Sequence, residues 1–201
     1  MLIKILYIVM AYFCGAIPFA YIISKIAAGV DIRTVGSGNP GATNVFRSVG
    51  KGAGITTFIL DMLKGFIPTF FAISIDNAFS YSVAVAAAAM LGHMFTVFLK
   101  FKGGKGVATG CGVFLALMPM PALIAFGFFA LIFGASGYVA LGSVCAALFM
   151  PFAAYFTGYS MEAVIFSFAV ALLVIFKHRK NISRLRAGKE YRFKIFGKRD
   201  K

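Results

Sequence analysis

Long apolar runs separated by short polar segments restrict the possible folds of this chain more than any other feature. Of the 201 residues, 61% are hydrophobic and 13% are charged, whereas a water-soluble domain contains roughly a quarter charged residues. This composition excludes an ordinary soluble fold, a disordered chain and a small disulfide-stapled scaffold. We therefore expect an integral membrane protein.

The lengths of the apolar runs predict a helical bundle. A helix needs about 20 apolar residues to cross a bilayer core of ~30 Å, and residues 2–24, 55–75 and 80–99 form three such runs. Proline and glycine clusters divide the apolar region after residue 106 into four shorter helices that end near Phe176. We predict an all-α membrane protein of about seven transmembrane helices with glycine-rich cytoplasmic loops. Five spans are the alternative, if two short helices are re-entrant or merged.

The distribution of basic residues predicts the topology. Lys and Arg gather in residues 25–54, 100–106 and 177–201, and the last of these segments holds 11 of the 20 basic residues. The turns on the other side of the predicted bundle contain none. Because cytoplasmic segments carry an excess of Lys and Arg, we predict an external N-terminus and a cytoplasmic C-terminus.

The domain organisation is expected to be simple. We predict one transmembrane domain over residues 1–186 and a basic cytoplasmic tail over residues 187–201, attracted to anionic membrane lipids. The net charge of +14 does not indicate nucleic acid binding, because no fold or aromatic platform for nucleic acid accompanies it. The first apolar run lacks a convincing cleavage site, so we expect a retained span.

Three cytoplasmic segments are more polar and glycine-rich than helix connections require. They are Gly36 to Asn44 with the nearby Arg47, Lys100 to Gly106 with Thr109 soon after, and Lys177 to Arg184. Each combines cations with hydroxyl or amide side chains, and the first two add a flexible glycine-rich backbone, which suits phosphate because its oxygens need N–H donors and positive charge. We predict phosphate-binding sites.

Two nucleotide-binding patterns are excluded. Gly36-x-Gly38-x-x-Gly41 matches a dinucleotide fingerprint, but it follows a membrane helix where a β-strand is required. The Gly104-Lys105 pair resembles the end of a P-loop, yet Gly106 replaces the hydroxyl residue that would bind magnesium. The six acidic residues are scattered, and we predict neither a metal site nor a cofactor.

Four ionisable residues are candidates for special roles. Asp61 and Lys64 share one helical face within the second run, where a mutual ion pair would satisfy both, so we favour a structural role. His93 could orient a loop backbone or bind substrate. His178 lies where the last span reaches the cytoplasm, with Asn181 on the same face; a histidine there can accept a proton or hold a hydroxyl for attack.

Three segments together carry a resemblance to a known family. They read Gly-Ser-Gly-Asn-Pro-Gly-Ala-Thr-Asn at 36–44, Lys-Phe-Lys-Gly-Gly-Lys-Gly-Val-Ala-Thr at 100–109 and His-Arg-Lys-Asn-Ile at 178–182. There the chain resembles the bacterial acyl-phosphate:glycerol-3-phosphate acyltransferases, and Ser143 and the Asp61-x-x-Lys64-Gly65 segment also fit the pattern. The likeness covers essentially the whole chain.

The resemblance implies a reaction and a location. An acyl chain would move from acyl phosphate to the 1-hydroxyl of glycerol 3-phosphate, giving lysophosphatidic acid and phosphate, the first step of phospholipid synthesis. We expect a monomeric enzyme in the bacterial inner (cytoplasmic) membrane, with its active site facing the cytoplasm. Its partners would be the two substrates and membrane lipids.

The resemblance also implies roles for individual residues. Ser143, His178, Asn181 and Lys105 are expected to be catalytic, with His178 as general base unless a phosphate oxygen of the donor takes the proton. Because acyl phosphate is already activated, we expect direct transfer without an acyl-enzyme. The residues expected to bind phosphate or substrate are Ser37, Gly38, Asn39, Gly41, Thr43, Asn44, Arg47, Lys102, Gly103, Gly104 and Lys105.

Two other classes of function remain as alternatives at this point. A transporter or channel for a phosphorylated solute could use the same loops as an anion gate. A membrane scaffold could bind anionic lipid through the basic tail.

Overall fold

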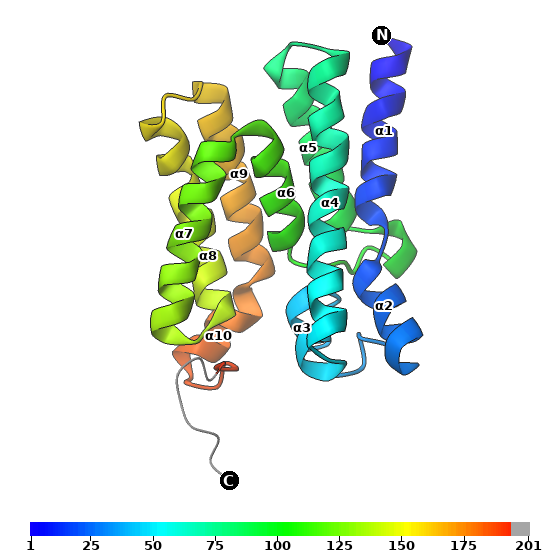
Figure 1. Ribbon diagram of the computed structural model, residues 1–201, viewed down its shortest axis with the longest axis vertical. Coiled ribbons are helices and arrows are strands. Elements are labelled where there is room, and N and C mark those ends of the chain that lie inside the picture. Colours follow the sequence, from blue (N-terminus) through cyan, green and yellow to red (C-terminus); the bar gives the residue numbers. More distant parts are fainter. Residues whose placement is uncertain (194–201) are drawn as a thin grey trace. The chain divides into compact units, whose positions relative to one another are not determined.

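The structure, a computed structural model, describes residues 1–193, in which every regular element is a helix. The helices pack into two compact units, Met1–Pro119 and Met120–Lys201, coloured from blue to green and from green to red in Figure 1. The all-α architecture expected from the apolar runs is thereby confirmed. The expected division into a 1–186 domain and a 187–201 tail stays a prediction, and residues 194–201 lie outside the described part of the chain.

The first unit is built around three long helices, α1, α4 and α5, which lie side by side (Figure 1). Its elements are α1 (Leu2–Ala16), α2 (Phe19–Ala28), α3 (Ala42–Ser48), α4 (Lys51–Ile75), α5 (Phe79–Met94), a short 3₁₀ turn η1 (Val97–Leu99) and α6 (Val107–Leu117). Pro18 separates α1 from α2 because proline lacks a backbone N–H and blocks continuation of a helix. The break leaves main-chain carbonyls without helical partners in the interior of the unit.

Small residues let the helices of the first unit approach closely. A Cβ on Gly15 of α1 would collide with the main chain of Ala89 in α5, and a Cβ on Gly65 of α4 would collide with the carbonyl oxygen of Thr109 in α6. Membrane helices associate through such small-residue contacts because the bilayer supplies little hydrophobic drive between them. These contacts hold α5 and α6, which flank the 100–106 loop, in a defined position.

The second unit contains α7 (Pro119–Ser136), α8 (Val139–Phe156), α9 (Met161–Lys177) and α10 (Arg179–Arg186), with α8 packed against α9. The chain after α10 returns to the turn between α7 and α8, where the Phe193 N–H donates to the Gly137 carbonyl at 2.8 Å. Arg192 Nε donates to the Ser136 carbonyl at 3.0 Å. Residues 187–193 are therefore part of the packed second unit.

Five helical segments among residues 1–193 are long and apolar enough to cross a membrane. They are Leu2–Ala28, Lys51–Ile75, Phe79–Leu99, Pro119–Ser136 and Val139–Phe156. The pair α9 and α10, bent by 60°, adds a sixth if it counts as one span, and the apolar α6 is shorter than a crossing requires. Each of the seven expected runs is thus helical, and five or six of them reach full spanning length.

Candidate active site

The 36–44 loop owes its shape to the buried side chain of Asn44. Asn44 Nδ2 donates to the carbonyl oxygens of Ile32 at 3.1 Å and Val35 at 3.0 Å, while its Oδ1 accepts the Ser37 N–H at 2.9 Å. Gly36 has a φ of +59° and lies so close that a Cβ would collide with the Asn44 amide. Asn44, expected to bind phosphate, thus uses its amide to hold the loop that presents its neighbours.

An ion pair borders this loop at its N-terminal side. The Arg33 guanidinium donates three hydrogen bonds to Asp31, the shortest at 2.6 Å, and lies 5.2 Å from the centre of the Tyr21 ring. These bonds lower the pKa of the Asp31 carboxyl to about 2. Both side chains are substantially exposed, so the pair contributes little to stability.

The 100–106 loop lies directly on the end of α5. The Gly104 N–H donates to the His93 carbonyl at 3.2 Å. A Cβ on Gly103 would collide with that same carbonyl, and a Cβ on Gly104 would collide with His93 Nε2. These two glycines, expected from the sequence to bind phosphate, are required here by the close approach of the loop to α5.

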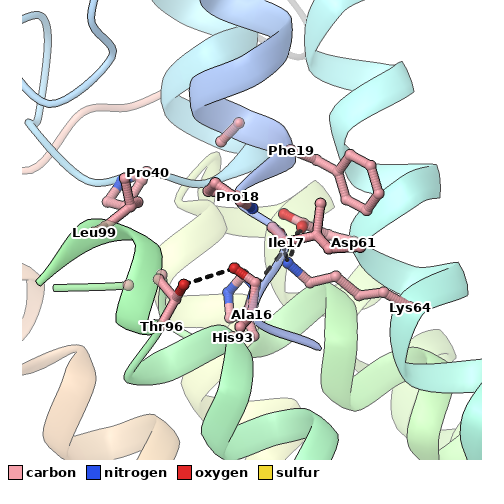
Figure 2. Close-up of a pocket in the computed structure, with 13 residues that line it drawn as sticks. Ala16, Ile17, Pro18, Phe19, Pro40, Asp61, Lys64, His93, Thr96 and Leu99 are labelled. Atoms are coloured by element: carbon pink, nitrogen blue, oxygen red, sulfur yellow. Dashed lines mark hydrogen bonds and ion pairs between the residues drawn. The ribbon is translucent and has the colours of Figure 1, made fainter. Parts of the chain in front are cut away.

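The two glycine-rich loops meet at one small pocket. The Gly104 Cβ position is 3.1 Å from the Pro40 carbonyl oxygen, and Pro40, Gly103, Gly104 and His93 line the pocket together with residues of the α1–α2 break, α4 and η1. Figure 2 shows Asp61, Lys64, His93 and Thr96 grouped around the break at Ile17 and Pro18. The structure therefore brings together two segments that lie some sixty residues apart in the sequence.

The predicted ion pair between Asp61 and Lys64 is confirmed. Lys64 Nζ lies 2.6 Å from Asp61 Oδ1, and both side chains are almost completely buried. Lys64 also donates to the Ile17 carbonyl at 2.7 Å, and Thr96 Oγ1 donates to the Ala16 carbonyl at 2.6 Å (Figure 2). The carbonyls released by the helix break are thus bound by polar side chains of α4 and of the segment before η1.

His93 connects this buried cluster to the 100–106 loop. Its Nδ1 lies 3.7 Å from Asp61 Oδ1, its Nε2 edge faces Gly104, and its carbonyl accepts the Gly104 N–H. Of the two roles that the sequence leaves open, these contacts support orientation of the loop backbone. The sequence offers a signal for the cluster, since Asp61 and Lys64 are charged residues within a span, but it does not reveal that His93 joins them.

In the second unit, His178 occupies the bend between α9 and α10. Its side chain is buried, and Nδ1 lies 2.8 Å from the Val174 carbonyl oxygen. Because a carbonyl only accepts hydrogen bonds, Nδ1 carries a proton in this contact, and Nε2 is then the acceptor nitrogen when the ring is in its neutral form. Ser143, also buried, donates to the Val139 carbonyl at 2.8 Å within α8.

Asn181 is held by a residue that sequence reasoning did not single out. Asn181 Nδ2 donates to Glu190 Oε1 at 2.6 Å, and Arg184 Nε donates to the other oxygen of the same carboxylate at 2.7 Å. Glu190 orients an expected catalytic amide from the C-terminal side of α10. Its sequence signal is weak: it is an isolated acid in a basic segment.

The remaining predicted residues differ in exposure. Asn44, Gly103 and Gly104 are buried, whereas the others from the first unit lie at its surface or are partly buried. This second group contains Ser37, Gly38, Asn39, Gly41, Thr43, Arg47, Lys102 and Lys105. Over residues 1–193 there is no cluster of three or more His, Cys, Asp or Glu side chains that could hold a metal ion.

Comparison with known proteins agrees over nearly the whole chain. Residues 5–188 match the family model described as glycerol-3-phosphate acyltransferase. The glycerol-3-phosphate acyltransferase of Endomicrobium trichonymphae is 64% identical over 99% of this chain and 100% of that protein. That of Syntrophotalea carbinolica is 48% identical, with 92% and 94% of the two chains covered.

Solved structures lead to the same family. The crystal structure of PlsY, an integral membrane glycerol 3-phosphate acyltransferase, in its glycerol 3-phosphate form is 41% identical, with a TM-score of 0.90 and 94% and 95% of the two chains covered. Its lysophosphatidic acid form is 40% identical with a TM-score of 0.88. This chain therefore belongs to the glycerol-3-phosphate acyltransferase family and is a multi-pass integral membrane acyltransferase.

Proposed function

We propose that this protein transfers an acyl chain from acyl phosphate to the 1-hydroxyl of glycerol 3-phosphate. The observation that carries the proposal is the meeting of two glycine-rich basic loops at Pro40 and Gly104 in the first unit. An acyl phosphate and a glycerol 3-phosphate each bring one phosphate group, which accounts for two such loops. The solved relatives are described in glycerol 3-phosphate and lysophosphatidic acid forms, the acceptor and the product of this reaction.

Phosphate binding is assigned to the first unit. Arg47, in the last turn of α3, and Lys105, just before α6, supply the positive charge. Ser37 and Asn39 supply hydroxyl and amide donors from the loop that Asn44 holds in shape. Such charge also stabilises the departing phosphate and the oxyanion that develops on the acyl carbonyl. The further residues assigned to substrate contact are Gly38, Gly41, Thr43, Lys102, Gly103 and Gly104.

We assign orientation of the acceptor hydroxyl to His178, Asn181 and Ser143. The hydrogen bond from Nδ1 to Val174 makes Nε2 of His178 the ring's acceptor for the glycerol hydroxyl. Asn181, held by Glu190, and Ser143 complete this set. We propose His178 as the general base, with a phosphate oxygen of the donor as the competing proton acceptor.

We propose direct transfer. The 1-oxygen of glycerol 3-phosphate attacks the acyl carbon, the bond from that carbon to the phosphate oxygen breaks, and the hydroxyl proton leaves to His178 or to the departing phosphate. Because the mixed anhydride is already activated, positioning of the two substrates can supply several kcal/mol of the barrier reduction. A covalent acyl-enzyme is unnecessary.

The reaction is tested with the purified full-length protein in detergent. Phosphate release from acyl phosphate should depend on glycerol 3-phosphate and match the lysophosphatidic acid formed. Release that ignores the acceptor, or transfer only from another acyl donor, would contradict the proposal. Isolation of an acyl group on Ser37, Ser143 or a cysteine after rapid quenching would contradict direct transfer.

The proposed setting is the bacterial inner membrane, with a monomeric enzyme whose active site and C-terminus face the cytoplasm. For the first unit, the Lys4–Asp76 ion pair supports the proposed topology because it joins the start of α1 to the end of α4, at the opposite end of α4 from the 36–44 loop. The basic loops then share one side, as the excess of Lys and Arg requires. Labelling of engineered single cysteines in intact cells tests which segments face the cytoplasm and which face the exterior.

A further inference from the structure

The 100–106 loop is fitted to α5 at three glycines. Gly103 and Gly104 approach His93, and a Cβ on Gly106 would collide with the Met94 side chain. Lys105 lies between Gly104 and Gly106, two residues before α6 begins at Val107. The direction in which Lys105 projects is therefore set by how its glycine neighbours lie on α5.

The 100–106 loop contacts His93 of α5 through both its main chain and its side chain. Its carbonyl accepts the Gly104 N–H at 3.2 Å, and its ring edge lies against the Gly104 Cα. The other ring edge faces Asp61, with Nδ1 at 3.7 Å from Oδ1. Rotation of this ring would therefore disturb either the buried carboxylate or the loop backbone.

Asp61 is itself held in place. Lys64 Nζ lies 2.6 Å from Asp61 Oδ1 and donates to the Ile17 carbonyl at 2.7 Å. The carboxylate, the ammonium and the imidazole are each less than 10% exposed. A chain of buried polar contacts thus runs from the α1–α2 break through α4 to His93 and the 100–106 loop.

We propose that His93, oriented by Asp61, is a positioning residue that sets the direction of Lys105 and thereby tunes phosphate binding. The inference rests on the proposed role of Lys105 in phosphate binding. His93 itself needs no contact with substrate for this role. It acts by holding Gly104, the residue directly before Lys105.

The test is a double-mutant cycle on binding, which does not depend on the identity of the acyl donor. Dissociation constants for glycerol 3-phosphate and for inorganic phosphate are measured by calorimetry with the full-length protein in detergent. The variants are H93A, K105A and the double variant, with G52A as a control, because nothing lies within 4 Å of a Cβ at Gly52. The cycle is read on the ligand whose binding K105A weakens.

We expect the effect of H93A on ligand binding to depend on the presence of Lys105. H93A should weaken binding about tenfold in the wild-type background, and it should have no further effect, within about twofold, in the K105A background. H93Q, which retains a polar side-chain end at this position, should recover part of the loss. G52A should bind as the wild type does.

Different failures identify different errors. If H93A weakens binding equally with and without Lys105, its role is merely structural and the inference is wrong. The inference also fails if a folded H93A protein binds like the wild type. If K105A weakens neither ligand, both the phosphate site in the proposed function and this inference fall, whereas absence of transfer from acyl phosphate alone overturns only the proposed donor.

A pair of glycine variants keeps the contact testable if H93A folds poorly. A methyl group on Gly104 collides with the His93 ring, whereas one on Gly103 collides with the His93 carbonyl. Replacing the imidazole by the smaller serine side chain (H93S) removes the first collision but not the second. H93S should therefore raise the Tm of the G104A variant but not that of the G103A variant. Equal effects on both glycine variants would contradict the ring–loop contact.

Discussion

The Lys64 ammonium donates a 2.7 Å hydrogen bond to the carbonyl oxygen of Ile17, the residue at which α1 gives way to α2. Proline at position 18 disfavours a helical conformation for Ile17, so the Ile17 carbonyl does not accept the N–H four residues further on; its main-chain donor is the Phe19 N–H at 3.1 Å. Lys64 is also paired with Asp61 at 2.6 Å. One buried cation therefore pairs with a carboxylate and binds a carbonyl oxygen at a helix break, which explains why the second span tolerates two charges.

Removal of one partner of this pair should be severely destabilising. Lys64→Met removes the ammonium from the buried Asp61 carboxylate and from the Ile17 carbonyl, at a cost of about 3–5 kcal/mol. Thermal unfolding in detergent should show a large fall in Tm. The combined variant with Asp61→Leu should recover part of the loss, and a double variant less stable than Lys64→Met would contradict the pairing.

The loop formed by residues 36–44 should collapse without the Asn44 amide. Asn44→Ala removes the donor to the Ile32 and Val35 carbonyls and the acceptor of the Ser37 N–H, at a cost of about 2 kcal/mol; the Val35 carbonyl keeps the Gly38 N–H. Asn44→Asp keeps the acceptor for Ser37 but loses both donors, so it should not restore stability. Ser48→Ala is the matched control, because its hydroxyl makes only a 3.5 Å contact with Asn44. Comparable Tm values for all three variants would refute this role.

Loss of the Lys105 charge should abolish transfer. We expect Lys105→Ala to reduce kcat/KM to background, because its ammonium is proposed to stabilise the departing phosphate. Lys105→Arg should retain some activity if charge is the main requirement. The assay is phosphate release with saturating acyl phosphate, and an active Lys105→Ala enzyme would remove the proposed phosphate site.

Substitution of His178 separates the two proposed proton acceptors. If His178 is the base, His178→Ala should lower kcat by roughly 10²–10⁴-fold with little change in KM. Steady-state kinetics with varied glycerol 3-phosphate measures both constants. Near-normal kcat with a raised KM would instead identify a phosphate oxygen of the donor as the acceptor of the proton.

We expect Glu190 to affect catalysis by holding the Asn181 side chain. Glu190→Ala removes the acceptor of the 2.6 Å bond from Asn181 and the partner of Arg184, so we expect kcat to fall about tenfold or more. Glu190→Gln keeps an oxygen for Asn181 and should retain most activity. Arg184→Ala serves as the control for the charge pair alone; if it lowers kcat as much as Glu190→Ala, the effect does not pass through Asn181.

Much of the architecture was accessible from the sequence because its signals are local. Apolar run length predicts membrane helices, and proline at position 18 or glycine clusters predict their breaks. The i,i+3 spacing of Asp61 and Lys64 predicts their ion pair, since residues three positions apart lie on the same face of a helix. The motifs at 36–44 and 100–109 predict the family, which the comparisons establish.

The sequence by itself determined a helical membrane protein, its glycine-rich loops and its acyltransferase family. Only the tertiary structure decided that the Asn44 amide and the Gly104 N–H form hydrogen bonds within the protein. It also decided that Glu190 accepts a hydrogen bond from Asn181 and that His93 lies between Asp61 and the 100–106 loop. The physical reason is range: helix periodicity relates residues three or four positions apart, whereas these contacts depend on where packed helices place groups that the chain separates.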